Sequence, residues 1–103
     1  MTIKTEFSTY RNVFLGTSRY RADNSLYIGA WNEADGPITD ITVCLNDKNL
    51  KENEAYVDTN NFPEAISFIK KYKLGKPTGR FGASGFCYYP IVEFDMDEID
   101  KHR

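Results

Sequence analysis

The 103-residue sequence predicts an α+β domain in which an antiparallel sheet of four to five strands carries one α-helix on one face. Three observations predict this class: an alternating pattern with turn signals over residues 10–46, a helical apolar stripe over residues 62–74, and a β-prone run over residues 86–94. The length suffices for one hydrophobic core. We therefore expect one domain over residues 1–94, followed by a charged tail over residues 95–103 that frays.

Residues 10–46 predict three consecutive antiparallel strands. Side chains alternate between the two faces from Leu26 to Trp31 and again from Ile38 to Leu45, which is the period of a strand. Asp35–Gly36 lies between these two runs and is a strong signal for a tight hairpin. The segment is therefore interpreted as a three-stranded meander.

Residues 62–74 predict the helix. Asn61 is placed to cap its first turn, and Glu64 three residues later completes a capping box. Lysines in the last turn and Gly75 just beyond it predict where the helix ends. The apolar stripe that this helix should bury consists of Phe62, Ala65, Ile66 and Ile69.

The segment after the helix predicts a connector and a final strand. Its spaced glycines, Gly79, Gly82 and Gly85, are typical of a loop that needs positive φ angles. A phosphate-binding loop is disfavoured, because the segment follows the C-terminus of a helix and not its N-terminus. Pro90 cannot donate a hydrogen bond within a sheet, so the final strand should lie at an edge or be bulged near this residue.

Composition and charge exclude several classes of function. A net charge of −2 argues against a strongly basic nucleic-acid binder and against a DNA mimic. His102 is the only histidine, and Cys44 and Cys87 lack the spacing of metal ligands, so we expect free thiols, no metal, no cofactor and no catalytic residues. No apolar run approaches the roughly 20 residues that cross a bilayer, and no secretory signal is evident. We expect a cytoplasmic protein that has no membrane partner and is not an enzyme.

Aromatic and acidic residues are the candidates for binding a protein partner. Aromatics make up 15% of the chain, and Tyr and Trp are enriched in binding hot spots. Tyr27 and Trp31 share one face of a predicted strand, which is either covered by a second layer or exposed to a partner. The acidic run could occupy a basic groove. The expected partner-binding residues are Tyr27, Trp31, Tyr89, Glu93, Asp95, Asp97, Glu98 and Asp100.

Two alternatives use other surfaces. A basic run with interleaved aromatics favours nucleic-acid binding, although a solvated helix end explains the same pattern. The residues of this alternative are Lys70, Lys71, Lys73, Lys76 and Arg80. The other alternative is a self-associating structural module, a homodimer that forms along the edge bearing Pro90 or through the face of Tyr27 and Trp31.

The segment from Ser25 to Phe94 resembles a family of small bacterial proteins known only as a domain of unknown function. The matching residues are Leu26–Ile28, Asn32–Gly36, Ile41–Asn46, Glu54–Val57, Pro77–Arg80, Ser84–Phe86 and Tyr89–Pro90. The resemblance implies a protein carried by conjugative elements and phages, and it transfers no catalytic residues. Small proteins in that setting are often inhibitors of host defence, including anti-CRISPR and anti-restriction proteins.

These observations lead to one main hypothesis. We expect a non-enzymatic, protein-binding inhibitor of the anti-CRISPR type, which binds a CRISPR-associated or restriction nuclease and blocks its nucleic-acid groove. The aromatic residues would anchor the contact and the acidic run would enter the groove.

Overall fold

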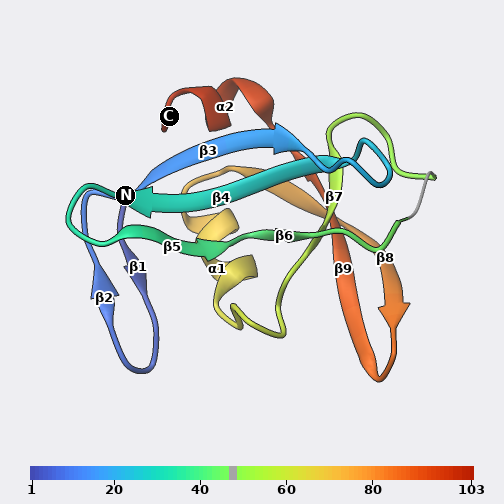
Figure 1. Ribbon diagram of the computed structural model, residues 1–103, viewed down its shortest axis with the longest axis horizontal. Helices are drawn as coiled ribbons and strands as arrows, with labels where there is room; N and C mark the ends of the chain where they lie inside the picture. Colours follow the sequence, from blue (N-terminus) through green and yellow to red (C-terminus); the bar gives the residue numbers. More distant parts are fainter. Residues whose placement is uncertain (47–48) are drawn as a thin grey trace.

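The computed structural model describes residues 1–46 and 49–103 and shows a mixed α/β fold (Figure 1). The elements within these residues are β1 (Ile3–Lys4), β2 (Thr9–Tyr10), β3 (Phe14–Arg19), β4 (Leu26–Asn32), β5 (Gly36–Asp40), β6 (Thr42–Val43), β7 (Glu54–Val57), α1 (Ala65–Lys71), β8 (Gly75–Ser84), β9 (Cys87–Phe94) and α2 (Met96–Asp100).

The strands form three antiparallel groups within the described residues, which corrects the prediction of one sheet with a helix on one face. β1 pairs with β2, a three-stranded sheet has the order β3-β4-β5, and a four-stranded sheet has the order β6-β7-β9-β8. Ile41, between β5 and β6, connects the last two sheets. Its N–H donates to the carbonyl of Ile28 at 2.9 Å, and its own carbonyl accepts from the N–H of Asp58 at 2.9 Å. The chain thus crosses from one sheet to the other at a single residue.

The three antiparallel strands of the predicted meander are present as β3, β4 and β5, but the predicted third strand over residues 38–45 is wrong in extent, because β5 ends at Asp40 and Thr42–Val43 form β6 in the four-stranded sheet. Asn32 pairs with Gly36 across the β4–β5 turn, and Gly36 has a φ of 72°, which a residue with a side chain rarely adopts. The Asn32 side chain accepts from the N–H of Asp35 at 2.6 Å and donates to its carboxylate at 3.0 Å. These bonds hold the turn that the Asp–Gly signal predicts.

Helix α1 begins later and ends earlier than predicted. Asn61 does not cap it, because its side chain donates to the Asp58 carboxylate at 2.9 Å and stabilises the preceding turn. The helix therefore starts after Glu64, which makes no side-chain capping bond. The predicted stripe is largely confirmed: Phe62, Ala65 and Ile69 are buried, and Ile66 packs at the margin of the core.

The segment that was predicted to be a glycine connector is most of strand β8. Lys73, with a φ of 57°, takes the left-handed position after α1, and Gly75 is already the first residue of β8. Gly75 serves close packing, since a Cβ there would lie 2.7 Å from the carbonyl oxygen of Glu93. Gly85 occupies a two-residue turn between β8 and β9, where its φ of 59° suits the first position of a type II′ hairpin.

Pro90 lies in β9, which is not an edge strand, so the prediction that its strand lies at an edge is wrong. β9 pairs with both β7 and β8. The register of β8 shifts between Pro77 and Phe81, directly beside the Phe81–Pro90 pair, so the predicted irregularity is present in the neighbouring strand.

Residues 95–103 were predicted to fray and are instead folded onto the core. Met96–Asp100 form α2, and the Asp95 side chain caps it by accepting from the Glu98 N–H at 3.1 Å. Ile99 is fully buried in the main core. The carbonyl of His102 accepts from the Leu15 N–H at 2.7 Å, which places the end of this segment along β3.

The main core lies between the sheets and the helices. It combines the inner faces of β3 and β4 with residues from α1, β9 and α2, including Ile28, Ile41, Ile69, Phe94 and Ile99. A smaller cluster of Tyr56, Tyr89 and Ile91 lies on the four-stranded sheet. Figure 1 shows that the β1–β2 and β8–β9 hairpins project from the body on either side of α1.

Candidate functional site

The outer face of the three-stranded sheet carries an aromatic surface. Leu26, Ile28 and Ala30 point into the core, so the alternation of β4 turns Tyr27 and Trp31 outward. Phe14 of β3 is paired with Trp31, and their ring centroids are 5.4 Å apart. Both side chains are 38% exposed, and within the described residues no second layer covers them. The face of Tyr27 and Trp31 was expected to be either covered by a second layer or exposed, and in the structure it is exposed.

A hollow of about 450 Å³ lies on this face, which we call the aromatic hollow. Gly16 of β3 forms its open floor, and Tyr27 and Trp31 form its walls. Gly29 of β4 is paired with Gly16 and is covered by the Tyr27 phenol, which a Cβ on Gly29 would displace. A Cβ on Gly16 would have no atom within 4 Å, so the space above this residue is open. A bulge between Ala30 and Trp31 displaces the tryptophan wall relative to β5. Gly29 thus makes room for the Tyr27 ring, and Gly16 leaves the space between this ring and Trp31 open.

The Tyr27 wall is held in place. Its hydroxyl donates to Oδ1 of Asp40 at 2.8 Å, and its ring packs edge-on against Tyr20 with centroids 5.6 Å apart. Burial raises the pKa of the Tyr27 phenol to about 12, and the hydrogen bond to the Asp40 carboxylate adds to this. Asp40 lines the same hollow and makes no ion pair with any residue that the structure describes. The site therefore joins aromatic walls to an unpaired carboxylate.

Tyr89 and the predicted acidic residues do not join this site. Tyr89 is only 9% exposed and packs in the smaller cluster, so it is not a surface contact. Asp95 caps α2, Glu98 lies 3.5 Å from both Lys101 and His102, and Asp100 pairs with Arg103 at 2.6 Å. Within the described chain, Glu93, Asp95 and Asp97 have no ion pair, and Asp95 is engaged as the helix cap. The predicted acidic surface is thus partly neutralised by its own neighbours.

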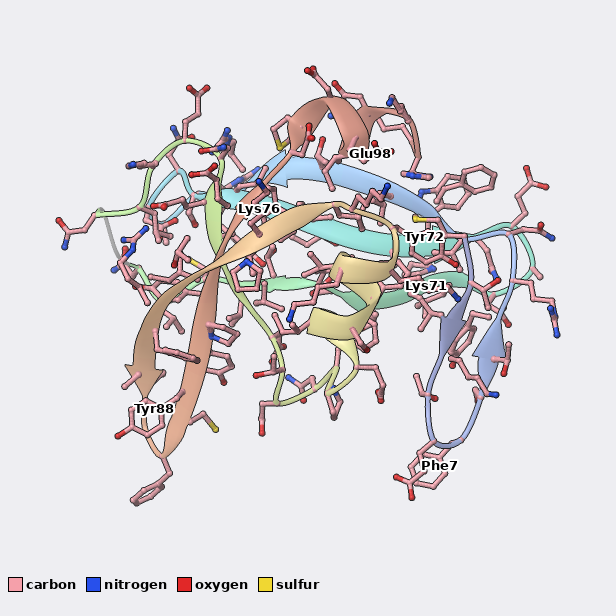
Figure 2. The ribbon with its side chains drawn as sticks, turned by 180° about the vertical axis from the view of Figure 1, so that it is seen from behind. Phe7, Lys71, Tyr72, Lys76, Tyr88 and Glu98 are labelled. Atoms are coloured by element: carbon pink, nitrogen blue, oxygen red, sulfur yellow. The ribbon has the colours of Figure 1, made fainter. Side chains whose placement is uncertain are left out.

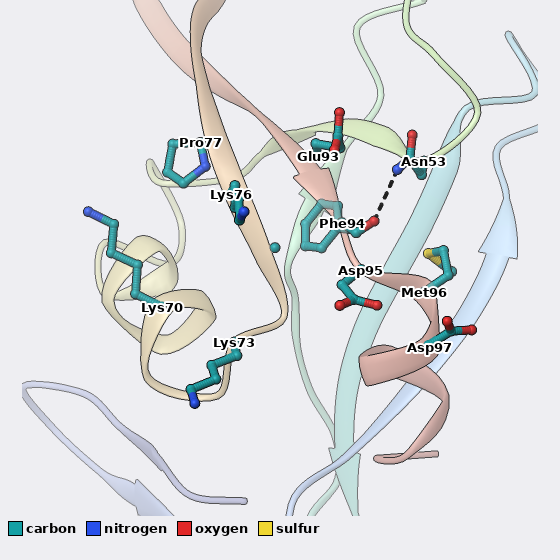
Figure 3. Close-up of a pocket in the computed structure, with 11 residues that line it drawn as sticks. Asn53, Lys70, Lys73, Lys76, Pro77, Glu93, Phe94, Asp95, Met96 and Asp97 are labelled. Atoms are coloured by element: carbon teal, nitrogen blue, oxygen red, sulfur yellow. Dashed lines mark hydrogen bonds between the residues drawn. The ribbon is translucent and has the colours of Figure 1, made fainter.

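Three of the predicted basic residues surround another hollow, of about 740 Å³ (Figure 3). Lys70, Lys73 and Lys76 lie on the side of α1 and β8, and Glu93, Asp95 and Asp97 lie on the side of β9 and α2. No described ion pair joins the two sides. The basic and acidic runs therefore meet at one mixed-charge hollow, which we call the charged hollow.

The other two predicted basic residues lie elsewhere. The Lys71 ammonium is 5.3 Å from the centroid of the Tyr72 ring, outside the charged hollow. Arg80 forms an ion pair with Glu54, which is only 2% exposed and also accepts from the Lys51 N–H at 3.0 Å. The Lys51 amide and the Arg80 guanidinium hold the pKa of the Glu54 carboxyl below its ordinary value. Arg80 therefore has a structural partner.

Sequence reasoning did not select several exposed aromatics as binding residues. Phe14 lies beside Trp31, and Phe81, Phe86 and Tyr88 lie on the β8–β9 hairpin, with Tyr88 labelled near its tip in Figure 2. The signal that could have found the hairpin is Ser84-Gly85-Phe86-Cys87, where a glycine opens a two-residue turn. The spaced glycines before this turn are also typical of a loop, so the sequence alone does not indicate that Phe81 and Tyr88 lie on one exposed strand face.

The described residues contain no group of three or more His, Cys, Asp or Glu side chains placed to hold a metal ion. Both cysteines are free, as predicted. Neither helix of the described part has the length and apolar composition that a bilayer crossing requires.

The fold and its surface define a small α+β domain with an exposed aromatic sheet face. The chain belongs to a family described as Domain of unknown function (DUF4313), whose model matches residues 14–103. The resemblance to a family of unknown function is thereby confirmed, and the match extends beyond residues 25–94 at both ends. Comparisons with curated proteins and with solved structures find no match.

Proposed function

We propose that this protein is a non-enzymatic protein-binding domain and that the aromatic hollow is its contact site. The single observation that supports this most strongly is the open space above Gly16 between two supported rings. Rigid aromatic side chains offer a large contact area at a low cost in conformational entropy. Tyr27 is already fixed by Asp40 and Tyr20, and Trp31 is packed against Phe14, so little ordering is required on binding.

The chemistry of the hollow favours a basic side chain from the partner. A cation over the face of a Trp or Tyr ring is attracted by the ring quadrupole. Asp40 adds a carboxylate at the rim, and only its Oδ1 is engaged by Tyr27. An arginine satisfies both features, since its planar guanidinium stacks on rings and pairs with carboxylates.

The more specific form of the proposal is an inhibitor of a host-defence nuclease, carried by a phage or conjugative element. A nucleic-acid groove is lined by arginines and lysines, which are the side chains that the aromatic hollow would accept. Glu93 and Asp97, exposed near the charged hollow, would add attraction toward a basic surface.

The test fills the hollow without disturbing the fold. Gly16→Leu places a side chain in the open space, and its matched control is Ser67→Leu, which adds the same side chain on the exposed side of α1, outside the hollow. The probes are purified CRISPR-associated and restriction nucleases, measured by cleavage of labelled DNA and by binding of the protein. We expect wild type and Ser67→Leu to inhibit at least one nuclease and Gly16→Leu to lose more than tenfold in potency. If no nuclease in the panel binds the protein, the proposal of a nuclease inhibitor is contradicted. If Gly16→Leu inhibits as potently as wild type, the aromatic hollow is not the contact site.

The charged hollow supports a second candidate, nucleic-acid binding through Lys70, Lys73 and Lys76. These lysines have no ion pair among the described residues and line one cavity. Titration of single-stranded DNA at two salt concentrations tests it, because phosphate contacts weaken steeply as salt rises. Lys73→Glu should abolish such binding, while Lys101→Glu, at the C-terminal cap of α2 and outside the charged hollow, should not. No binding at low salt would contradict this alternative.

A further inference from the structure

We propose that two copies of this chain pair through the lower part of strand β8, residues 80–84, and form an antiparallel dimer across the β8–β9 hairpins. β8 is the last strand of the four-stranded sheet, and no other strand of the described chain pairs with its outer side. An unpaired strand edge presents free N–H and C=O groups to another chain. This surface is separate from the aromatic hollow, so the proposal does not depend on that function.

Pro90 shows which backbone groups face outward. Phe81 is paired with Pro90, which has no N–H, so this is a pair whose members do not hydrogen-bond to each other. The N–H and C=O of Phe81 therefore point away from β9, toward the free edge. Ala83 is two residues further along and points the same way. The two-residue turn leads to the same assignment, because it places the hydrogen-bonded pair at Ser84 and Cys87.

The same part of the strand has an exposed apolar face. Phe81 and Pro90 are one cross-strand pair and Ala83 and Tyr88 are another, so all four side chains share a face. Phe81 is 63% exposed and Tyr88 is 73% exposed, and Phe86 at the turn is fully exposed. The hairpin stands out from the body and the tip lies away from α1 (Figure 2). The tip thus combines free backbone groups with exposed rings.

The sequence of this edge is complementary to itself. In an antiparallel pairing centred on Gly82, Phe81 of one copy faces Ala83 of the other, so each large ring meets a small side chain. The outward N–H and C=O groups of Phe81 and Ala83 then exchange hydrogen bonds in both halves. Arg80 faces Ser84 of the second copy, so no like charges oppose each other, and its own charge is already paired with Glu54.

The area fits a weak dimer. Edge pairing brings the two Phe81 side chains into the contact, which removes on the order of 200–300 Å² of aromatic surface from water, while Tyr88 on β9 and Phe86 in the turn stay on the face of the joined sheet. Strand pairing adds to this area, and weak interfaces bury less than about 1,200 Å², so we expect dimerisation that depends on concentration. The upper part of β8 is protected, because Lys76 and Pro77 lie beside α1 and both residue types discourage edge pairing (Figure 3). Pairing is therefore confined to residues 80–84.

Sedimentation equilibrium over a range of protein concentrations tests the proposal. Ala83→Pro removes an outward N–H at an edge, where proline is tolerated, and Phe81→Glu places a charge on the apolar face. We expect wild type to be a concentration-dependent dimer, both variants to be weakened at least tenfold, and the control Thr17→Val on β3 to behave as wild type. Far-UV circular dichroism checks that each variant is folded.

Two results would overturn the proposal. The first is a wild-type protein that stays monomeric at every concentration. The second is a dimer that still forms in either folded variant. If both variants dimerise as wild type does, the dimer uses another surface. If only Ala83→Pro dimerises as wild type does, the copies are held by ring contacts without strand pairing. If Ala83→Pro does not fold, Phe81→Glu decides between the outcomes.

Discussion

The outer edge of β3 is covered by other segments of the chain, whereas the outer edge of β8 is partly uncovered within the described residues. The N–H of Leu15 donates to the His102 carbonyl at 2.7 Å, and Val13 exchanges bonds of 2.8 and 3.1 Å with Met1, so residues from both ends of the chain cover the side of β3. Residues 80–84 of β8 have no such cover among the described residues. The β3 edge is closed by segments far away in sequence, whereas the β8 edge is blunted by local Lys and Pro residues and only over its first half. This contrast makes the hairpin tip the place where pairing with another chain is expected.

The largest expected effect comes from opening the β3 edge. Ile99 is fully buried and anchors α2, so Ile99→Ala should lower the free energy of unfolding by about 3 kcal/mol. Urea denaturation measures this, and Asp97→Ala, an exposed change on the same helix, is the control. A loss below about 1 kcal/mol would mean that α2 does not support β3.

The next effect tests how the start of β8 is held. A Cβ on Gly75 would lie 2.7 Å from the Glu93 carbonyl oxygen and 3.0 Å from Cα of Phe94, both of them backbone atoms that cannot swing aside. Gly75→Ala should therefore cost about 2 kcal/mol of stability. Gly16→Ala, in open space on β3, should be neutral or stabilising by up to about 1 kcal/mol. Equal effects at the two glycines would contradict the close packing at Gly75.

A smaller effect concerns the ion pair between Arg80 and Glu54, which joins the middle of β8 to β7. Arg80→Ala should cost about 1–2 kcal/mol, since Glu54 is buried but keeps its bond from the Lys51 amide. The pKa of Glu54 is lowered in the folded state, so its stabilising contribution is present above the unfolded value of 4.5 and is lost as pH falls through the depressed value. The difference between wild type and Arg80→Ala should thus shrink in acid. A difference independent of pH would contradict the ion pair.

The smallest effect is in the Tyr27 wall of the aromatic hollow. Its phenol has a pKa of about 12 against an ordinary value of 10.0, so the proton is held more tightly in the folded state. The associated stability is present below the ordinary value and is lost as pH rises through the folded one. The phenolate absorbance of wild type minus that of Tyr27→Phe should show this titration, and Asp40→Asn should move it down. Titration at the ordinary value would mean that the wall is not fixed.

Local signals identified the elements that are stabilised by local interactions. The Asp35–Gly36 turn and the stripe of α1 depend on neighbouring residues, and the structure confirms both. β8 was missed because its glycines are read as a loop when their partner strand is unknown. α2 was missed because Ile99 is one apolar residue in an acidic run, and its burial depends on β3. At the aromatic hollow, Tyr27 and Trp31 were selected from their alternation, but Phe14 and Asp40 are identified only through the strand register.

The two hydrogen bonds of Ile41 have a consequence for how the molecule unfolds. One residue donates to Ile28 in the three-stranded sheet and accepts from Asp58 beside the four-stranded sheet, so neither sheet can open there without disturbing the other. We therefore expect a single cooperative unit, in which the amides of Ile41 and Asp58 exchange with solvent only through global opening. A ligand bound at the aromatic hollow would then slow amide exchange in β7 and β9 as well, although it touches neither strand.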